Sequence, residues 1–167
     1  MSLSMYDASV PALTSFLTNL SAILKKGAEY ASEKKIEETV LTGARLYPDM
    51  FALSRQVQIA CDQAKGCAAR LAGVEVPSFE DNEQTFAELQ ARIDKTLQFI
   101  GSVAADKING SEEKPIHLKI GPYELDFTGQ SYLLTFTLPN LYFHITTAYN
   151  ILRHNGVPLG KKDFVGG

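Results

Sequence analysis

The chain has 167 residues, of which 45% are hydrophobic and 21% charged, and its net charge is -3. This size and composition predict one globular domain over residues 1–167 that needs neither a disulfide nor a structural metal, because such a chain buries about two thirds of its unfolded surface. The charge gives no basic surface for nucleic acid, and no apolar run approaches the ~20 residues of a membrane span.

Two features bear on the compartment. The N-terminus lacks a basic segment followed by an apolar one, so no secretion signal is indicated and we expect a cytoplasmic protein. Residues 1–4 are interpreted as a cloning remnant, with Met5 as the natural start. Cys61 and Cys67 are six positions apart in a helical pattern, which suits neither a zinc pair nor a redox C-x-x-C. We interpret both as small residues at the edge of the core.

The first long helix is predicted from about Val10 to Ser32. Pro11 would lie in its first turn, where a missing N–H costs little. A shorter helical segment, Ile36 to Leu46, follows it. This segment should end before Pro48, because the residue preceding a proline is disfavoured in the helical conformation.

Two further long helices follow. The second is predicted from Pro48-Asp49 to Ala72, with apolar residues at spacings of three and four and with Gly73 as its C-terminal stop. Residues 74–82 form a loop that contains a proline and acidic residues. The third helix is predicted from Glu83 to Ile108, and Asn109-Gly110 ends it.

The hydrophobic period then changes before the last helix. Residues 116–120 and 123–127 alternate apolar and polar on both sides of Gly121-Pro122, which predicts a two-stranded hairpin. The fourth helix is predicted from Gln130 to Gly156. It contains Pro139, which should kink it or remove one backbone hydrogen bond.

Together these elements predict an all-α fold, a four-helix bundle with a small β-hairpin between the third and fourth helices. The turn-rich tail, Val157 to Gly167, is expected to wrap around the surface. Tyr132, Tyr142 and Tyr149 are predicted on the outer face of the fourth helix. Such an aromatic strip packs more often on the tail or on a second subunit than on a ligand. Because the hydrophobic faces of a bundle leave room for dimerisation, we also expect a homodimer.

A polar cluster interrupts the apolar side of the fourth helix. At about 100° per residue, its apolar residues form one broad arc: Leu133, Leu134, Phe136, Leu138, Leu141, Phe143, Ile145, Ala148, Ile151 and Leu152. Thr137, Asn140, His144 and Thr147 fall near the centre of that arc. An unpartnered buried polar group costs roughly 1 to 3 kcal/mol. These four side chains therefore either form hydrogen bonds with neighbouring residues or take part in the protein's function.

His144 is the strongest candidate for a functional residue in the cluster, because a histidine can ligate a metal, act as a base or hydrogen-bond a neighbour. With Asn140 and Thr147 it either lines a small polar pocket or belongs to a self-satisfied network that fixes the helix register. Both alternatives place the polar cluster inside the bundle.

Other polar residues have simpler interpretations. Gln56, Gln58 and Asp62 of the second helix are able to add one polar group toward the centre, although Gln58 and Asp62 also suit a solvent-exposed flank. His154 fits a cap at the helix C-terminus, and His117 lies on the polar face of a predicted strand. The sequence has no Glu-x-x-His, no G-x-S-x-G and no glycine-rich phosphate loop.

Three segments resemble a known family. They are RLYPDM at residues 45–50, RQVQIA at residues 55–60, and LPNLYFHITTAYNILRHNGVPLGK at residues 138–161. They are similar to the uncharacterised domain-of-unknown-function family nineteen-ninety-three, related to the DinB/YfiT-like bundles. The resemblance covers essentially the whole chain. It implies a four-helix bundle with a long connection between the second and third helices and a hairpin before the fourth.

The resemblance also implies a metal site, from which this chain departs. DinB-like proteins commonly hold zinc or nickel with three histidines, one from the second helix and two spaced H-x-x-x-H on the fourth. Their relatives include thiol-dependent transferases and isomerases. Here Asn140 stands four residues before His144, and the second helix has no histidine. An amide oxygen is a poor ligand for zinc or nickel.

We therefore predict a protein that binds an unknown small molecule without a tightly held metal, and that binds neither nucleic acid nor membrane. The candidate pocket residues are Asn140, His144, Thr147, Thr137 and Gln58. The alternative is a degenerate DinB-like metal-dependent transferase or hydrolase, in which His144 is a base or a weak ligand to zinc or nickel. A third hypothesis gives the polar cluster a packing role only.

Overall fold

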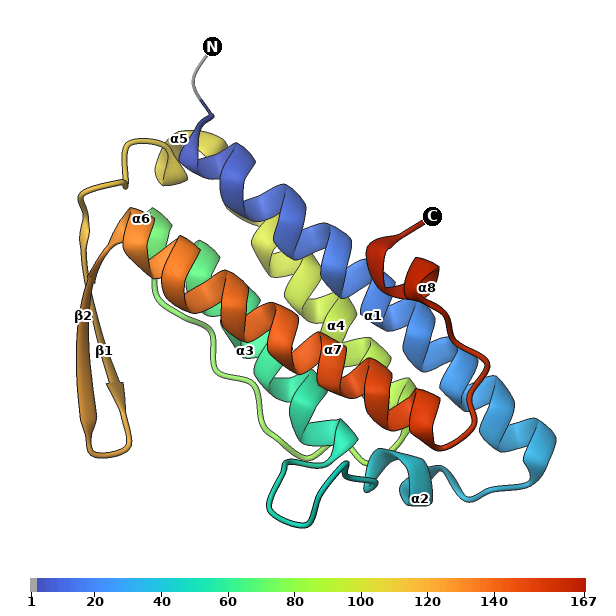
Figure 1. Ribbon diagram of the computed structural model, residues 1–167. Coiled ribbons are helices and arrows are strands. Elements are labelled where there is room, and N and C mark those ends of the chain that lie inside the picture. Colours follow the sequence, from blue (N-terminus) through green and yellow to red (C-terminus); the bar gives the residue numbers. More distant parts are fainter. Residues whose placement is uncertain (1–2) are drawn as a thin grey trace.

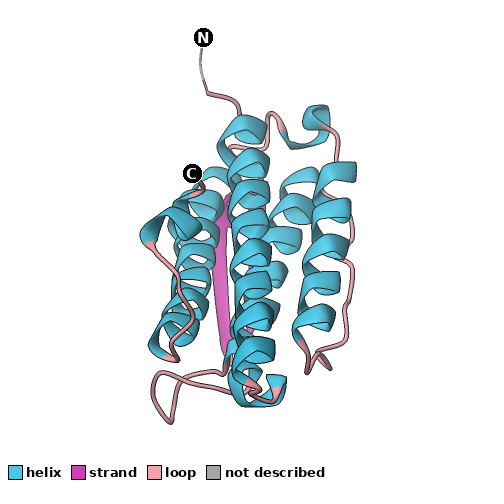
Figure 2. Ribbon diagram, turned by 90° about the vertical axis from the view of Figure 1, so that its right-hand side faces the viewer, coloured by secondary structure: helices cyan, strands magenta, loops and turns pink. Residues whose placement is uncertain are grey.

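Four long helices pack together in the computed structural model, which describes residues 3–167 (Figures 1 and 2). They are α1 (Met5–Lys34), α3 (Leu53–Ala72), α4 (Phe86–Ser102) and α7 (Leu138–His154). Helix α3 packs against both α7 and α4, and α1 packs against α4. This arrangement confirms the predicted four-helix bundle.

Helix α1 begins before the predicted Val10. The Ser4 hydroxyl caps it by accepting a hydrogen bond from the Asp7 N–H at 3.1 Å, which satisfies one backbone donor at the helix start. Pro11 therefore lies inside the helix, and its predicted place in the first turn is wrong. Of the four residues interpreted as a cloning remnant, residues 1 and 2 lie outside the described residues, whereas Ser4 belongs to the fold.

The connection from α1 to α3 is less helical than predicted. Helix α2 covers only Glu38–Thr42 of the predicted segment 36–46. Residues 48–49 form a turn between bends at residues 47 and 50, so α3 begins at Leu53 rather than beside the proline. Its C-terminal end is as predicted, because Gly73 adopts the left-handed conformation with φ 73°.

The predicted third helix is divided into α4 and α5 (Ala105–Ile108). Its start is set by a capping box rather than by Glu83: the Thr85 hydroxyl accepts from the Glu88 N–H at 3.2 Å, and the Glu88 carboxylate accepts from the Thr85 N–H at 2.9 Å. Val103 ends α4 because its backbone is extended, with φ -84° and ψ 114°.

The predicted hairpin is confirmed. Strands β1 (Pro115–Ile120) and β2 (Tyr123–Thr128) pair antiparallel, and Gly121 in the turn has φ 58°. Ile116 and Leu118 are buried, whereas His117 between them is exposed. Figure 1 shows the hairpin at one side of the bundle, connected directly to the start of the last long helix.

The last helical stretch changes its winding just before Pro139. Helix α6 (Gly129–Ser131) continues into the π-helical segment η1 (Tyr132–Thr137), and α7 follows without a break. Proline has no N–H and its ring clashes with the preceding turn of an α-helix. The wider π-helical turn accommodates that clash, so the predicted distortion lies on the N-terminal side of Pro139.

The C-terminal tail packs on the bundle through aromatic side chains. It contains the short helix α8 (Lys161–Val165), which lies over α1 in Figure 1. The Phe16 ring contacts the rings of Phe164 and Tyr142, with centroids 5.2 and 4.8 Å away. Tyr132, predicted on the outer face, is fully buried instead, because it lies in the π-helical segment, where spacing at 100° per residue does not apply.

The apolar arc predicted for the fourth helix needs two corrections. Leu134 and Phe143 are 49% and 56% exposed, whereas Leu141 and Ile145 are fully buried. Residues two positions apart lie about 200° apart on an α-helix, so Phe143 faces away from Leu141 and Ile145. His144, Thr147 and Thr137 of the predicted polar cluster are buried, and His144 faces α3.

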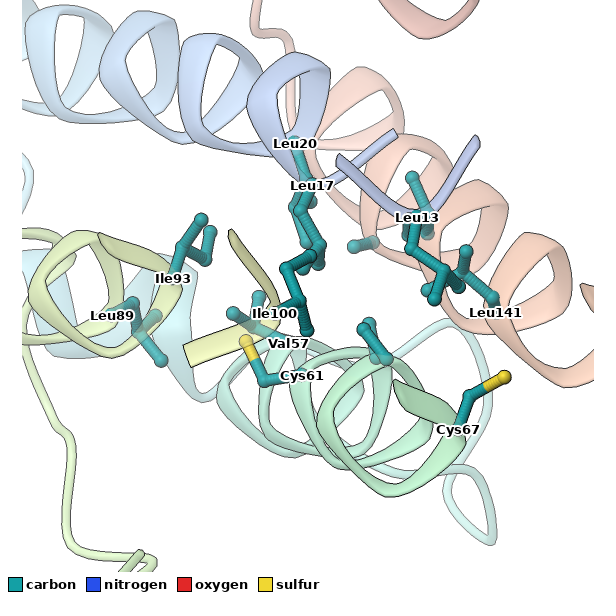
Figure 3. Packing of buried hydrophobic residues seen from close by; sticks show 14 of the residues in the cluster. Leu13, Leu17, Leu20, Val57, Cys61, Cys67, Leu89, Ile93, Ile100 and Leu141 are labelled. Carbon is teal, nitrogen blue, oxygen red and sulfur yellow. The ribbon is translucent and has the colours of Figure 1, made fainter. Parts of the chain in front are cut away.

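The core contains side chains from all four long helices (Figure 3). Leu17 of α1, Cys61 of α3, Ile93 of α4 and Leu141 of α7 are all fully buried. Cys67 is also fully buried, so the expectation that both cysteines lie at the core edge is wrong. Burial raises the pKa of both thiols to about 12, which keeps them protonated and unreactive.

Candidate functional site

A hydrogen-bonded pair joins α7 to α3. His144 Nδ1 lies 2.7 Å from Gln56 Oε1, and Gln56 Nε2 donates to the backbone oxygen of Phe51 at 3.0 Å. The second bond assigns the amide nitrogen to the Phe51 side, so Oε1 faces the imidazole and accepts its proton. Nδ1 therefore carries the hydrogen, and the neutral ring keeps its lone pair on Nε2.

The surroundings of His144 favour the neutral ring. Its side chain is almost buried, at 8% exposure. Burial lowers the pKa of His144 below its usual value, and the nearby Arg55 guanidinium lowers it further. Within residues 3–167 no group hydrogen-bonds Nε2. A neutral acceptor thus remains available at this position.

A cleft of about 560 Å³ lies between α3, β1 and the start of α7. Asn140 lines it, and His144 lies one turn further along α7. Phe51 and Arg55, which border the His144–Gln56 pair, line the same cleft. The structure therefore places Asn140 in the wall of the cleft, whereas His144 does not line it and lies one helical turn away.

The other polar residues of α7 and η1 are held differently. Asn140 Nδ2 donates to the Phe136 carbonyl and the Thr147 hydroxyl to the Phe143 carbonyl, both at 2.7 Å. These bonds to the preceding turn satisfy each donor within its own helix. Thr137 is fully buried, and its hydroxyl has no hydrogen-bond partner in the described part of the chain. Asn140 lines the cleft, whereas Thr147 and Thr137 do not.

Gln58 does not belong to this site. It is buried, so its predicted place on a solvent-exposed flank is wrong. Its Nε2 donates to Glu83 at 2.9 Å, and its Oε1 accepts from Arg55 at 3.3 Å. Gln58 is two positions from Gln56, so the two side chains leave α3 in opposite directions. Gln56 rather than Gln58 meets His144.

Sequence reasoning missed a buried ionic cluster between α3 and α4, whose Asp62 also lines the cleft. The Arg92 side chain is 1% exposed and contacts Glu83, Asp62 and Asp81 at 2.9, 3.0 and 2.8 Å. Lys65 also contacts Asp62, at 2.9 Å. Burial opposes the charge on Arg92, but the nearby carboxylates outweigh that effect and raise its pKa.

The cluster fastens the loop between α3 and α4. Phe79 of that loop lies against Lys65 and Lys95, whose ammonium nitrogens are 4.3 and 4.1 Å from its ring centroid. Such cation–π contacts add to the ion pairs. The available signal was the acidic run around Phe79, Glu80-Asp81-Asn82-Glu83, but periodicity alone does not reveal which arginine it meets.

The two other histidines lie where the sequence places them. His154 is exposed in the last turn of α7. His117 is exposed on β1, and its hydrogen bond to Asp126 raises its pKa. Neither histidine approaches the His144–Gln56 pair through a hydrogen bond.

Comparison with known proteins gives the family. Residues 5–165 match the model of the family described as domain of unknown function (DUF1993). The chain belongs to this family. It is also similar to the crystal structure of a DinB family member protein from Shewanella denitrificans, with 42% identity and a TM-score of 0.86 over 97% of this chain and 92% of that one. No curated protein matches the chain.

The match confirms the DinB-like bundle that the sequence motifs indicated. It also raises the question of whether this chain could hold the metal of DinB-like proteins. The zinc or nickel site implied by the DinB-like resemblance does not fit this DUF1993 protein. The side chains at the corresponding place that could ligate a metal are the amides of Asn140 and Gln56 and one imidazole, that of His144. Within residues 3–167, no three His, Cys, Asp or Glu side chains gather where they would hold a metal ion.

In the part of this DUF1993 protein that the structure describes, residues 3–167, no helix is both long and apolar enough to cross a bilayer.

Proposed function

We propose that this DUF1993 protein binds a small ligand in the cleft between α3, β1 and α7, with His144 as a neutral hydrogen-bond acceptor and no tightly held metal. One observation carries the proposal. Gln56 holds Nδ1 of His144, which leaves the lone pair of Nε2 without a partner in residues 3–167, one helical turn from Asn140 in the wall of a cleft of about 560 Å³. That volume suits a small molecule.

Asn140 adds a second polar group from the same helix. Its Nδ2 bonds the Phe136 carbonyl, so its Oδ1 is oriented as an acceptor for a ligand donor. A ligand that carries an N–H or O–H group would therefore meet two acceptors one helical turn apart. Both are preorganised by bonds that exist before the ligand binds, which lowers the entropic cost of binding.

The proposal is tested with a library of small metabolites and three proteins: wild type, His144→Ala, and the control His154→Ala on the exposed end of the same helix. We expect at least one compound to raise the melting temperature of wild type and His154→Ala and to shift the ¹⁵N resonance of His144 Nε2. His144→Ala should lose that stabilisation. Stabilisation that survives His144→Ala, or a library without effect on the His144 resonance, would refute the proposal.

The second candidate is a degenerate DinB-like metal-dependent transferase or hydrolase. One observation favours it: a hydrogen bond from Nδ1, like the one from His144 to Gln56, also orients a metal-ligating or basic imidazole. Metal analysis of protein purified without a histidine tag distinguishes the two. Stoichiometric zinc or nickel that disappears in His144→Ala would replace the first proposal with the second.

The cytoplasmic location and the homodimer remain predictions. The dimer is tested by light scattering on purified protein, where a mass near twice 18.3 kDa is expected. A mass of a single chain across the micromolar range would exclude it.

A further inference from the structure

The cleft beside Asn140 carries more positive than negative charge. Arg55, Arg70 and Lys119 line it, and among the described residues Asp62 is the only carboxylate in its lining. Charged groups that face a cavity need partners, because a low dielectric makes an unpaired charge costly. The net charge that the cleft presents to a ligand therefore depends on which of these charged groups already form ion pairs inside the protein.

Two of the four charges are paired within the protein. Asp62 accepts both Lys65 and Arg92 on one oxygen, at 2.9 and 3.0 Å. Arg55 pairs with Asp81 of the loop before α4. Asp62 is thus occupied by cations that do not line the cleft, and the charge of Arg55 is offset from outside it.

Arg70 and Lys119 are the other two charged residues of the cleft lining. Within residues 3–167 neither forms a salt bridge. Arg70 donates instead to the hydroxyl of the buried Tyr132 at 2.9 Å. Its guanidinium lies close against Gly66, where a Cβ atom would come within 2.3 Å of it. The half-buried Arg70 is therefore held in a defined position by a neutral group, with donors left over for an anion.

An apolar wall extends from Arg70 toward the other end of the cleft. Ile59, Leu118 and Phe136 supply it. Arg70 and the His144 partner Gln56 are 14 positions apart on α3, or about 21 Å along a helix axis at 1.5 Å per residue. The cleft thus combines a fixed cation at one end with apolar surface leading toward polar acceptors.

We propose that the cleft takes an amphipathic anion, a molecule with a carboxylate joined to an apolar chain. The carboxylate pairs with Arg70, and Lys119, further along β1, adds positive charge to the same cleft. The apolar chain lies on Ile59, Leu118 and Phe136 and runs toward Asn140. This inference rests on the proposed function, because it specifies the ligand class of the same cleft.

The experiment uses three probes with the same chain and different head groups: sodium octanoate, octylammonium chloride and 1-octanol. Each is titrated into the full-length ¹⁵N-labelled protein, and the amide resonances of the cleft and of the His144 ring are followed. We expect octanoate to bind best. Arg70→Met should weaken octanoate binding about tenfold, the loss that corresponds to one charge-assisted hydrogen bond. Arg153→Met, an exposed arginine at the end of α7, should leave binding unchanged.

Two further variants keep the inference testable if Arg70→Met does not fold. Lys119→Met changes only an exposed strand residue and should weaken octanoate but not 1-octanol. Tyr132→Phe keeps the ring and removes the hydroxyl that orients Arg70, so it should also weaken octanoate selectively.

The outcomes separate the two proposals. If the three probes bind the cleft equally and these variants have no selective effect, the anion inference is wrong and the proposed function stands. If none of the probes shifts the cleft or His144 resonances while another small molecule from the library does, the inference is again wrong. If neither probes nor library shift them, both proposals fail.

Discussion

His144 illustrates how neighbouring groups set the state of one side chain. The bond from Nδ1 to Gln56 determines which nitrogen holds the proton, and burial together with Arg55 disfavours the charged ring. The proton and the charge are thus both determined by residues of α3. At the scale of the residue, the structure accounts for a neutral imidazole with one available acceptor.

This account predicts a pH dependence of stability. Because the folded pKa of His144 is lowered, the unfolded state binds more protons than the folded state near its ordinary pKa of about 6.5. The contribution to the free energy of unfolding is complete above pH 6.5 and is lost as the pH falls below that value toward the folded pKa. Urea denaturation of wild type and His144→Gln between pH 8 and 5 measures it.

Comparison of the two proteins removes the titration of other groups from this measurement. The raised pKa of the exposed His117 acts in the opposite direction, since its contribution is present at low pH and lost as the pH rises. It is the same in both proteins. Parallel stability profiles for wild type and His144→Gln would show that the His144 pKa is not lowered by folding.

At the scale of elements, Arg92 links α4, α3 and the loop between them. Its guanidinium bonds the backbone oxygen of Glu80 at 2.9 Å as well as the carboxylates of Asp62, Asp81 and Glu83. A loop with few apolar residues is ordinarily mobile. Here one buried cation supplies the attachment that apolar burial does not.

Arg92→Met therefore should destabilise the fold by about 3 kcal/mol, because it leaves a carboxylate cluster without its cation. This value is at the low end of the usual range, since Asp62 and Asp81 are partly exposed. Chemical denaturation measures the loss, and limited proteolysis should show earlier cleavage in residues 74–85. Lys107→Met, at an exposed lysine of α5, is the control, and an equal effect there would contradict the specific role of Arg92.

A second prediction concerns the junction of the hairpin with α6. A Cβ atom at Gly129 would lie 1.9 Å from the backbone oxygen of Ser111. The neighbour is backbone, which cannot rotate away, so Gly129→Ala should cost about 1 to 3 kcal/mol or more through overpacking. Thermal unfolding checks the prediction.

Gly101 in α4 provides the matched control. Its added Cβ would meet no atom within 4 Å, and Gly101 lies in the last turn of the helix. Gly101→Ala should therefore stabilise the protein by up to about 1 kcal/mol, because alanine has the higher helix propensity. The same chemical change would thus have opposite signs at the two positions, and equal signs would contradict the packing argument.

At the scale of the molecule, periodicity predicted the bundle because four helices each bury one apolar face, and alternation predicted the hairpin. Contacts between distant segments were not predictable in this way. Arg92 meets the loop of Asp81 only through the tertiary fold, and Gln58 is buried by the same cluster. The π-helical turn before Pro139 shifts the helix phase, so Tyr132 is buried where a regular helix would expose it.

The continuous core predicts that this molecule unfolds as one unit. Cys61 and Cys67 are fully buried in a core to which all four long helices contribute, and both thiols have a pKa of about 12. Local fraying should therefore expose neither. We expect both cysteines to react with a thiol reagent at pH 8 only after global opening, with the same dependence on urea as the far-ultraviolet circular dichroism transition. Single-cysteine variants, Cys61→Ala and Cys67→Ala, separate the two sites. If one cysteine is labelled at urea concentrations far below the dichroism transition, that end of α3 opens independently and the single cooperative core is excluded.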